Sequence, residues 1–184
     1  MCGIVGVVTG SNNQYCLEEI INNMAEQIIH RGPDNRGVFF DEELSFCCAH
    51  QRLSILDLSK AGNQPMMSFH KRMIISFNGE IYNFKELRKK LDLETKITWR
   101  GNSDTEVFIN AIEFWGLKKT LELSIGMFAF ALLDKYQKKL FLVRDRFGEK
   151  PLYWGFEGSN SAKALVFASD IGAIKEFPSF NYDI

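Results

Sequence analysis

A cysteine at position 2 is the first residue of this chain that could carry out chemistry. Removal of the initiator Met1 leaves Cys2 with both a thiol and a free α-amine. A thiol is largely protonated at neutral pH, and an α-amine can take up its proton directly or through one water. The position therefore predicts a nucleophile that carries its own base. The plainer alternative is a small buried residue at the start of a strand, which is how free cysteines most often occur.

The histidines and the other cysteines do not form a metal-binding pattern. The three histidines and four cysteines show no spacing typical of zinc ligands, so no metal site is expected. The adjacent Cys47 and Cys48 lie on an expected strand and should point to opposite faces, which argues against a disulfide framework. With no export signal, we expect free thiols and a cytoplasmic location.

The composition favours a globular protein that acts on small molecules. Apolar residues make up 46% of the chain and charged residues 24%, which excludes disorder. The 22 basic and 23 acidic residues give a formal charge of -1, which leaves no excess positive charge for nucleic acid. No apolar run reaches the ~18 residues of a membrane span. We expect one domain over residues 1–184, with no nucleic-acid or membrane partner.

Hydrophobic periodicity predicts the elements that position Cys2. A strand is expected over residues 3–8 and a helix over 17–32, which should stop at Gly32-Pro33. Two capping boxes predict further helices, one from Asn83 with Glu86 over residues 83–91 and one from Ser103 with Glu106 over 103–115. Further strands are expected over 38–40, 44–50, 72–79, 127–134, 139–145, 151–156 and 164–169.

The run MFAFALL, residues 127–133, is apolar at both odd and even positions. A strand that is apolar on both faces lies between layers. The chain is therefore expected to be an α+β protein, a four-layer αββα sandwich of two antiparallel sheets flanked by helices.

Ordered sequence blocks along the whole chain resemble one known family. The blocks are MCGIVG (1–6), HRGPD (30–34), HQRLSILD (50–57), GNQPM (62–66), FNGEIYN (77–83), SDTEV (103–107), GMFAFALLD (126–134), RDRFGEKPLYW (144–154) and FASDI (167–171). Together they resemble the glutaminase domain of asparagine synthetase, a class II glutamine amidotransferase of the N-terminal nucleophile hydrolase superfamily. The resemblance implies that Cys2 attacks the side-chain amide of glutamine and releases ammonia.

The same resemblance assigns an oxyanion hole to Asn78 and Gly79. The side-chain amide of Asn78 and the backbone N–H of Gly79 would stabilise the tetrahedral oxyanion that forms on attack. Glycine allows the backbone to approach the substrate closely. The alternative for this dipeptide is a hairpin turn, which Asn-Gly favours by itself.

The resemblance also implies countercharges for free glutamine. Arg52 would bind the α-carboxylate with its planar fork, and Glu80 and Asp104 would hold the α-ammonium. Alternatively, Arg52 is a surface charge, and Asp104 complements the dipole of the helix that it begins. Backbone groups of the segment after Arg52 would line the same pocket, namely Leu53, Ser54, Ile55 and Leu56.

Other charged residues in the shared blocks have structural interpretations. His30, Arg31 and Asp34 would shape the wall around Cys2, and His50 would be a hydrogen-bonded wall residue. The charges of RDRFGEKPLYW are expected to make turns and ion pairs. The chain departs from the family pattern at Ile125 and Gly172, and neither residue lies in the expected pocket.

The resemblance implies a partner that uses the ammonia. An ATP-dependent synthetase domain with an SGGxDS loop is expected in cis or in trans, and this loop is absent from the chain. Glutamine hydrolysis itself needs no cofactor, and ATP and Mg are expected only in that absent domain. The acceptor is aspartate by default or another carboxylate, and a homo-oligomer is compatible with the sequence. The other hypotheses are a catalytically silent docking module and a different amide hydrolase of the superfamily.

Overall fold

The computed structural model describes residues 1–10, 15–158 and 163–180. The chain divides into two compact units, each built on its own antiparallel sheet. The first unit comprises residues 1–53 and 151–184, and the second comprises residues 54–150. Predicted catalytic and binding residues occur in both units.

The first unit holds a five-stranded antiparallel sheet of order β2-β3-β1-β9-β8. Its strands are β1 (Gly3–Thr9), β2 (Asn35–Asp41), β3 (Phe46–Arg52), β8 (Tyr153–Glu157) and β9 (Ala164–Ala168). The central strand β1 is buried along most of its length, as its run of apolar residues predicts. Gly3 pairs with Gln51, so Cys2, which directly precedes β1, lies beside the end of β3.

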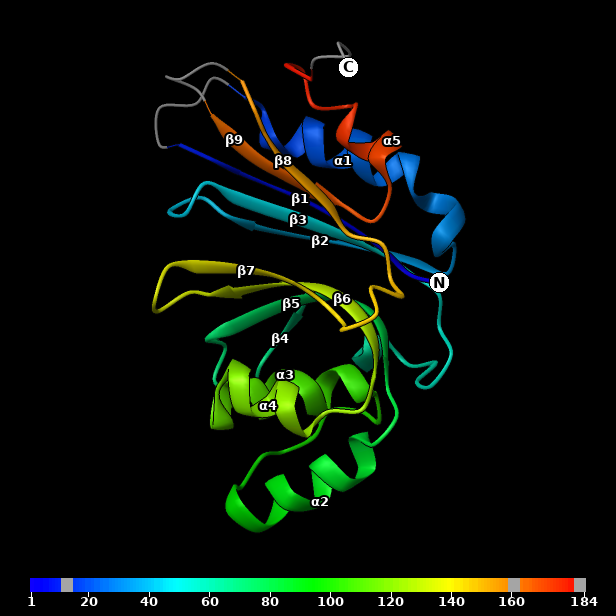
Figure 1. Cartoon of the computed structure of the whole chain (residues 1–184), viewed down its shortest axis with the longest axis vertical. Coiled ribbons are helices and arrows are strands. Elements are labelled where there is room, and N and C mark those ends of the chain that lie inside the picture. The colour runs from blue at the N-terminus through cyan, green and yellow to red at the C-terminus, as the bar shows by residue number, and fades with distance from the viewer. Residues whose placement is uncertain (11–14, 159–162, 181–184) are drawn as a thin grey trace. The chain divides into compact units, whose positions relative to one another are not determined.

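Helix α1 (Leu17–Gln27) and the short helix α5 (Ile171–Ile174) cover one face of this sheet (Figure 1). α1 buries Ile21 and Met24 in a core that also contains Val5 and Cys47. Cys48, the next residue, does not belong to this core, which confirms that the adjacent cysteines point to opposite faces. The predicted helix over 17–32 ends early, and a 3₁₀ turn (Ile29–Arg31) leads to Gly32.

The second unit holds a four-stranded antiparallel sheet of order β4-β5-β6-β7. Its strands are β4 (Met66–Met67), β5 (Met73–Ile81), β6 (Gly126–Asp134) and β7 (Lys139–Arg144), and a 3₁₀ turn (Lys60–Gly62) precedes them. β5 and β6 pair along their full nine-residue length, from Met73 opposite Asp134 to Ile81 opposite Gly126. This pairing fixes the register of the segment that contains Asn78.

Helices α2 (Phe84–Glu94), α3 (Asp104–Trp115) and α4 (Leu117–Leu123) lie on one side of this sheet (Figure 1). Four aromatic rings form the centre of the core between sheet and helices, with ring centroids 5.4 to 6.3 Å apart. They belong to Phe77, Phe108, Phe128 and Phe130. This rigid core holds α3 and β5 together, and these two elements carry most of the predicted site residues of the unit.

The two predicted helix caps have different outcomes. The Ser103 hydroxyl accepts the N–H of Glu106 at 3.2 Å, so the N-cap of α3 is confirmed. The Asn83 side chain makes no cap bond to α2, and that part of the prediction is wrong. Its amide instead donates to the Leu123 carbonyl and accepts the Ile125 N–H, both at 2.9 Å. Asn83 therefore ties the end of α4 to the start of β6.

The predicted α+β class, with two antiparallel sheets accompanied by helices, is confirmed. The sequence interpretation missed the short elements α4, α5 and β4. No helix in the described ranges combines the length and the apolar character that a bilayer crossing requires.

Candidate functional site

Cys2 lies beside the end of β3 in the first unit. The Leu53 N–H donates to the Cys2 sulfur at 3.4 Å, and the thiol lies 3.7 Å from the Leu53 carbonyl oxygen. Cys2 is half-buried directly before β1, and the choice between a nucleophile and a structural residue at the start of a strand stays a prediction. A half-buried sulfur with an N–H donor beside it is a suitable environment for a nucleophilic thiol.

Arg31 holds the backbone of Cys2. Its Nε donates to the Cys2 carbonyl oxygen at 3.2 Å. Its Nη2 is buried and has no hydrogen-bond partner among the described residues. The neighbouring Gly32 allows the chain to lie close to β3, because a Cβ there would lie 2.3 Å from the Gln51 carbonyl oxygen. His30 and Asp34, also predicted to shape the wall around Cys2, are exposed.

Arg52 is the last residue of β3 and is only 7% exposed. The alternative of a surface charge is therefore wrong. A guanidinium fork can bind a carboxylate, such as that of an amino-acid substrate, in two parallel hydrogen bonds. His50, two residues earlier on the same strand, is fully buried, in keeping with the predicted wall position.

In the second unit, Asn78 lies within β5, where it pairs with Ala129 of β6. The alternative of a hairpin turn at Asn78-Gly79 is therefore wrong. The Asn78 side chain is 1% exposed, and its Nδ2 has no acceptor among the described residues. A buried amide donor without an acceptor costs roughly 1–3 kcal/mol, so its presence needs a reason beyond folding.

Gly79 lies in β5, between two residues whose backbone N–H groups donate to polar side chains. The Phe128 N–H donates to the Asp145 carboxylate at 3.1 Å, and the Phe128 carbonyl accepts the Asp145 N–H at 2.8 Å, so both groups point away from β5. The pair Gly79–Phe128 is therefore not hydrogen-bonded, and the Gly79 N–H points to the opposite edge of β5.

On that edge the neighbouring N–H groups are capped by polar side chains. The Phe77 N–H donates to Gln64 at 2.7 Å, and the Ile81 N–H donates to Asp104 at 2.8 Å. The Gly79 N–H lies between them. The geometry of β5 therefore directs the Gly79 N–H away from β6, as a donor to an oxyanion would require.

Asp104 is buried at the start of α3 and lies near Glu80. Its Oδ1 accepts the Thr105 N–H, and its Oδ2 accepts that of Ile81, both at 2.8 Å. Burial raises the pKa of Asp104, the charge of Glu80 raises it further, and these N–H donors oppose the rise. Asp104 thus lies on the first turn of a helix, as the dipole interpretation requires, and also beside a second carboxylate. Two neighbouring carboxylates attract a cation such as an α-ammonium.

The segment after Arg52 is irregular and anchored to the start of α3. Asp57 Oδ2 accepts the Asn102 N–H at 2.9 Å, which holds the loop near Asp104. Ile55 is 71% exposed and Leu56 is 46% exposed. Asp57 ends the shared block HQRLSILD, but the sequence interpretation gave it no role, because its partner lies 45 residues away.

Asp145 and Arg144 of the RDRFGEK block hold a turn, as predicted, while the ion pairs expected of this block stay a prediction. Asp145 accepts the backbone N–H groups of Phe128, Phe147 and Glu149. These bonds lower the pKa of Asp145 although its burial raises it. Arg144 donates to the Lys150 and Gly148 carbonyl oxygens, which closes the turn.

The structure brings the predicted residues together in two groups, each within one unit. Cys2, Arg52 and Leu53 form the group of the first unit, and the group of the second unit is Ser54, Ile55, Leu56, Asn78, Gly79, Glu80 and Asp104. Their roles in catalysis stay predictions. Within residues 1–10, 15–158 and 163–180, no three His, Cys, Asp or Glu side chains gather as metal ligands would.

Comparison with known proteins identifies the class. A family profile described as a glutamine amidotransferase domain matches residues 1–184. The chain therefore belongs to the glutamine amidotransferase domain family.

The relatives are named glutamine-hydrolysing asparagine synthetases. The chain is 38% identical over 180 residues to asparagine synthetase 2 of Bacillus subtilis, covering 97% of this chain and 23% of that protein. It is 36% identical over 178 residues to asparagine synthetase 2 of Arabidopsis thaliana, covering 96% and 29%. The chain thus spans between a fifth and a third of the length of these two relatives.

A solved structure has the same fold. It is a glutamine phosphoribosylpyrophosphate amidotransferase from B. subtilis, with a TM-score of 0.72 and 19% identity. The match covers 95% of this chain and 43% of that chain.

Proposed function

We propose that this chain hydrolyses L-glutamine to glutamate and ammonia, with Cys2 as the nucleophile after removal of Met1. The observation that carries the proposal is the buried Asn78 amide donor, which has no acceptor among the described residues. An oxyanion is an acceptor that is present only during the reaction, so it explains why such a donor is kept.

The proposed reaction proceeds through a thioester. The α-amine of Cys2 takes the thiol proton, and Sγ attacks the side-chain carbonyl carbon of glutamine. Negative charge on the oxygen is stabilised by the Asn78 amide and the Gly79 N–H. The carbon–nitrogen bond then breaks as ammonia leaves with the proton. Water hydrolyses the thioester through a second oxyanion and releases glutamate.

Substrate selection follows from the charges of free glutamine. Arg52 binds the α-carboxylate in two parallel hydrogen bonds, and Asp104 with Glu80 holds the α-ammonium. The backbone of Leu53, Ser54, Ile55 and Leu56 completes the recognition. A substrate without an α-amino acid group lacks both charged partners, which disfavours the alternative of a different amide hydrolase of the same superfamily.

The ammonia is proposed to serve an ATP-dependent amide-forming synthetase domain of the asparagine synthetase type, in cis or in trans. The names of the relatives, glutamine-hydrolysing asparagine synthetases, support this type of synthetase domain. ATP and Mg act in that partner domain, and glutamine hydrolysis needs no cofactor. Aspartate is the proposed acceptor, with another carboxylate as the alternative. The cytoplasm is the proposed compartment.

The test measures glutamate and ammonia released from glutamine by protein whose processing is known. Intact-mass spectrometry first establishes that Met1 has been removed. The processed protein should turn over glutamine, Cys2→Ala should abolish turnover, and Cys16→Ala should not, because Cys16 is an exposed cysteine before α1. Full retention of Met1 would favour the silent docking module. Equal activity of Cys2→Ala would reject Cys2 as the nucleophile.

A further inference from the structure

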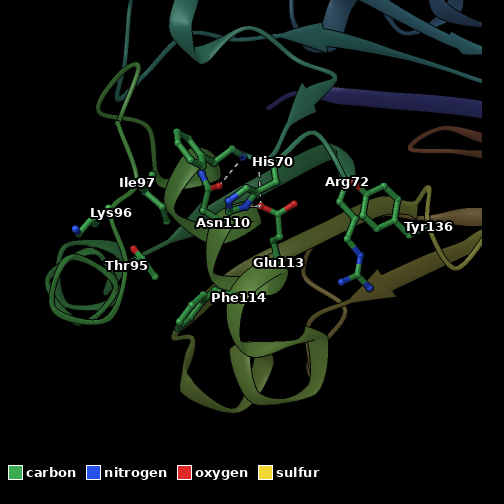
Figure 2. A pocket seen from close by; sticks show the side chains of 10 residues that line it. His70, Arg72, Thr95, Lys96, Ile97, Asn110, Glu113, Phe114 and Tyr136 are labelled. Carbon is green, nitrogen blue, oxygen red and sulfur yellow. Dashed lines mark hydrogen bonds and ion pairs between the residues drawn. The ribbon is translucent and has the colours of Figure 1, made fainter.

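A cavity of about 490 Å³ lies in the second unit, between the start of β5, the second half of α3 and the segment after α2 (Figure 2). The residues that matter for its chemistry are Phe69, His70, Arg72, Lys96, Phe114 and Tyr136. Its volume is in the range of small-molecule sites.

This cavity is separate from the predicted glutamine residues of the same unit. Arg72 directly precedes β5, whereas Gly79 and Glu80 lie near its other end. At ~3.3 Å per residue, the seven residues from Arg72 to Gly79 span about 23 Å. A ligand in the cavity therefore does not occupy the Gly79–Asp104 region.

Three aromatic side chains in the lining are exposed instead of packed in the core. Phe69 is 42% exposed, Phe114 is 50% exposed and Tyr136 is 74% exposed. They approach the cavity from three different segments: the β4–β5 turn, the end of α3 and the β6–β7 turn. Aromatic faces exposed around a hollow are suited to stack on a planar ring.

Basic residues lie in the two turns that supply Arg72 and Tyr136 to the lining. The turn before β5 contains Lys71 and Arg72, and the turn before β7 contains Lys135 and Lys138. The Lys135 N–H donates to the Arg72 carbonyl oxygen at 3.1 Å, so the two basic turns lie side by side. Grouped cations around a concave surface attract anions.

Glu113, which lines the cavity, and Asp134, which pairs with the lining Arg72, both have partners. Asp134 pairs with the guanidinium of Arg72. Glu113 accepts the Ser68 hydroxyl at 2.7 Å and lies 2.9 Å from His70 Nδ1. Figure 2 shows Glu113 and His70 close together, with Lys96 on one side and Arg72 beside Tyr136 on the other.

Lys96 is a second cation of the lining, besides Arg72. Its ammonium makes no ion pair with any residue that the structure describes. It extends from the segment between α2 and α3, next to Ile97, whose side chain lines the cavity.

We propose that this cavity binds a nucleoside monophosphate. The base stacks on the exposed aromatic side chains, chiefly Phe114, and Lys96 holds the phosphate in the field of the two basic turns. The site selects a ligand that combines a planar ring with an anion, because the aromatic side chains bind the ring and Lys96 binds the anion.

Isothermal titration calorimetry with AMP, GMP, CMP and UMP tests the proposal. At least one nucleotide should bind saturably with a dissociation constant below about 1 mM. The matching nucleoside, which lacks the phosphate, and ribose 5-phosphate, which lacks the base, should each bind at least about tenfold more weakly. Absence of saturable binding by all four nucleotides would overturn the proposal.

Variants test the location. Lys96→Ala and Phe114→Ala each remove one of the two recognition elements at an exposed position, so both should fold and weaken binding about tenfold. Lys89→Ala removes an exposed lysine of α2 outside the cavity and should bind as the parent protein does. Unchanged affinity in both cavity variants would reject this site. The measurement requires no turnover, so Cys2→Ala protein should give the same result even if the glutaminase proposal fails.

Discussion

Asp104 Oδ2 accepts the backbone N–H of Ile81 at 2.8 Å, so the first residue of α3 caps the edge of β5 two residues beyond Gly79. The carboxylate is 6% exposed, and burial raises its pKa, with a further rise from the charge of Glu80. A cationic ligand would stabilise the negative charge of Asp104, which both burial and the neighbouring Glu80 disfavour. The same bond also explains how α3 is aligned on the sheet.

Asp104→Asn should raise KM for glutamine about tenfold or more while changing kcat less. Asparagine keeps an oxygen that can accept the Ile81 N–H, but it loses the charge that attracts the α-ammonium. In the parent protein, KM should also rise as the pH falls toward the raised pKa of Asp104, because protonation removes that charge. The variant should lack this component of the pH dependence. Steady-state kinetics across acidic and neutral pH measure both effects.

Glu86→Gln, which removes an exposed acidic group from the first turn of α2, is the matched control. It should leave KM unchanged at every pH. An equal pH dependence of KM in Asp104→Asn and the parent protein would show that Asp104 does not set ammonium affinity.

Gly79→Ala should destabilise the second unit. A Cβ at Gly79 would lie 2.2 Å from the Met127 carbonyl oxygen and 2.6 Å from Phe128 Cα, so β5 and β6 would have to separate. Overpacking of this kind lowers the free energy of unfolding by about 1–3 kcal/mol. Urea denaturation measures the change.

Gly155→Ala is the matched control, because Gly155 also lies in a strand and its Cβ would meet nothing closer than 3.8 Å. Its effect should stay within about 0.5 kcal/mol. A Gly79→Ala protein as stable as this control would mean that the glycine is not required by strand packing.

Arg72→Met should destabilise the protein at neutral pH and much less in acid. Burial raises the pKa of Asp134, but hydrogen bonds from Arg72 and from backbone N–H groups outweigh it, and the pKa is lowered overall. A lowered carboxyl pKa contributes stability above the pKa of the unfolded state, which is lost as the pH falls toward the folded value. The variant should lose roughly 1–3 kcal/mol at pH 7, and the difference should shrink as Asp134 is protonated.

Arg36→Met provides the comparison for this ion pair. Arg36 pairs with Glu26, whose side chain is 62% exposed, whereas the Asp134 side chain is only 3% exposed. Loss of an exposed pair should cost no more than about 1 kcal/mol. Denaturation at several pH values distinguishes the two cases, and equal losses would contradict the importance of burial.

The sequence predicted the elements whose signals are local. The apolar run of β1 and the Ser103 cap of α3 are read directly from neighbouring residues, and the structure confirms both. The Asn83 cap failed because its side chain has better partners at Leu123 and Ile125, some 40 residues later. Helix α4 was missed because it follows directly on Gly116, which looks like the end of a helical region. Contacts with residues far away in the sequence determine the role of a residue such as Asn83, and a single sequence does not reveal those contacts.

The candidate site was predicted largely through family resemblance, and its physical basis needed coordinates. Asn78-Gly79 has the composition of a turn, yet nine residues of pairing with β6 make it strand. The direction of the Gly79 N–H follows from the hydrogen bonds of Phe128 with Asp145, which local spacing does not encode. Asp57 likewise gains its role only through Asn102.

Asn78→Leu should separate activity from stability. Leucine has a similar shape and removes a buried amide donor that has no acceptor among the described residues. The free energy of unfolding should therefore stay the same or rise by up to about 1 kcal/mol. Turnover of glutamine should fall about 10²- to 10³-fold, because the oxyanion loses one of its donors.

Asn110→Leu is the control for this change. Asn110 is equally buried, but its oxygen accepts the Phe69 N–H and its amide donates to the Glu106 carbonyl, both at 2.8 Å. Its replacement strands two partners and should lower the free energy of unfolding by about 1–3 kcal/mol. Chemical denaturation and glutamine turnover measured on both variants test the contrast. If Asn78→Leu is as destabilised as Asn110→Leu, the Asn78 amide supports the fold, and the reason for assigning it to the oxyanion disappears.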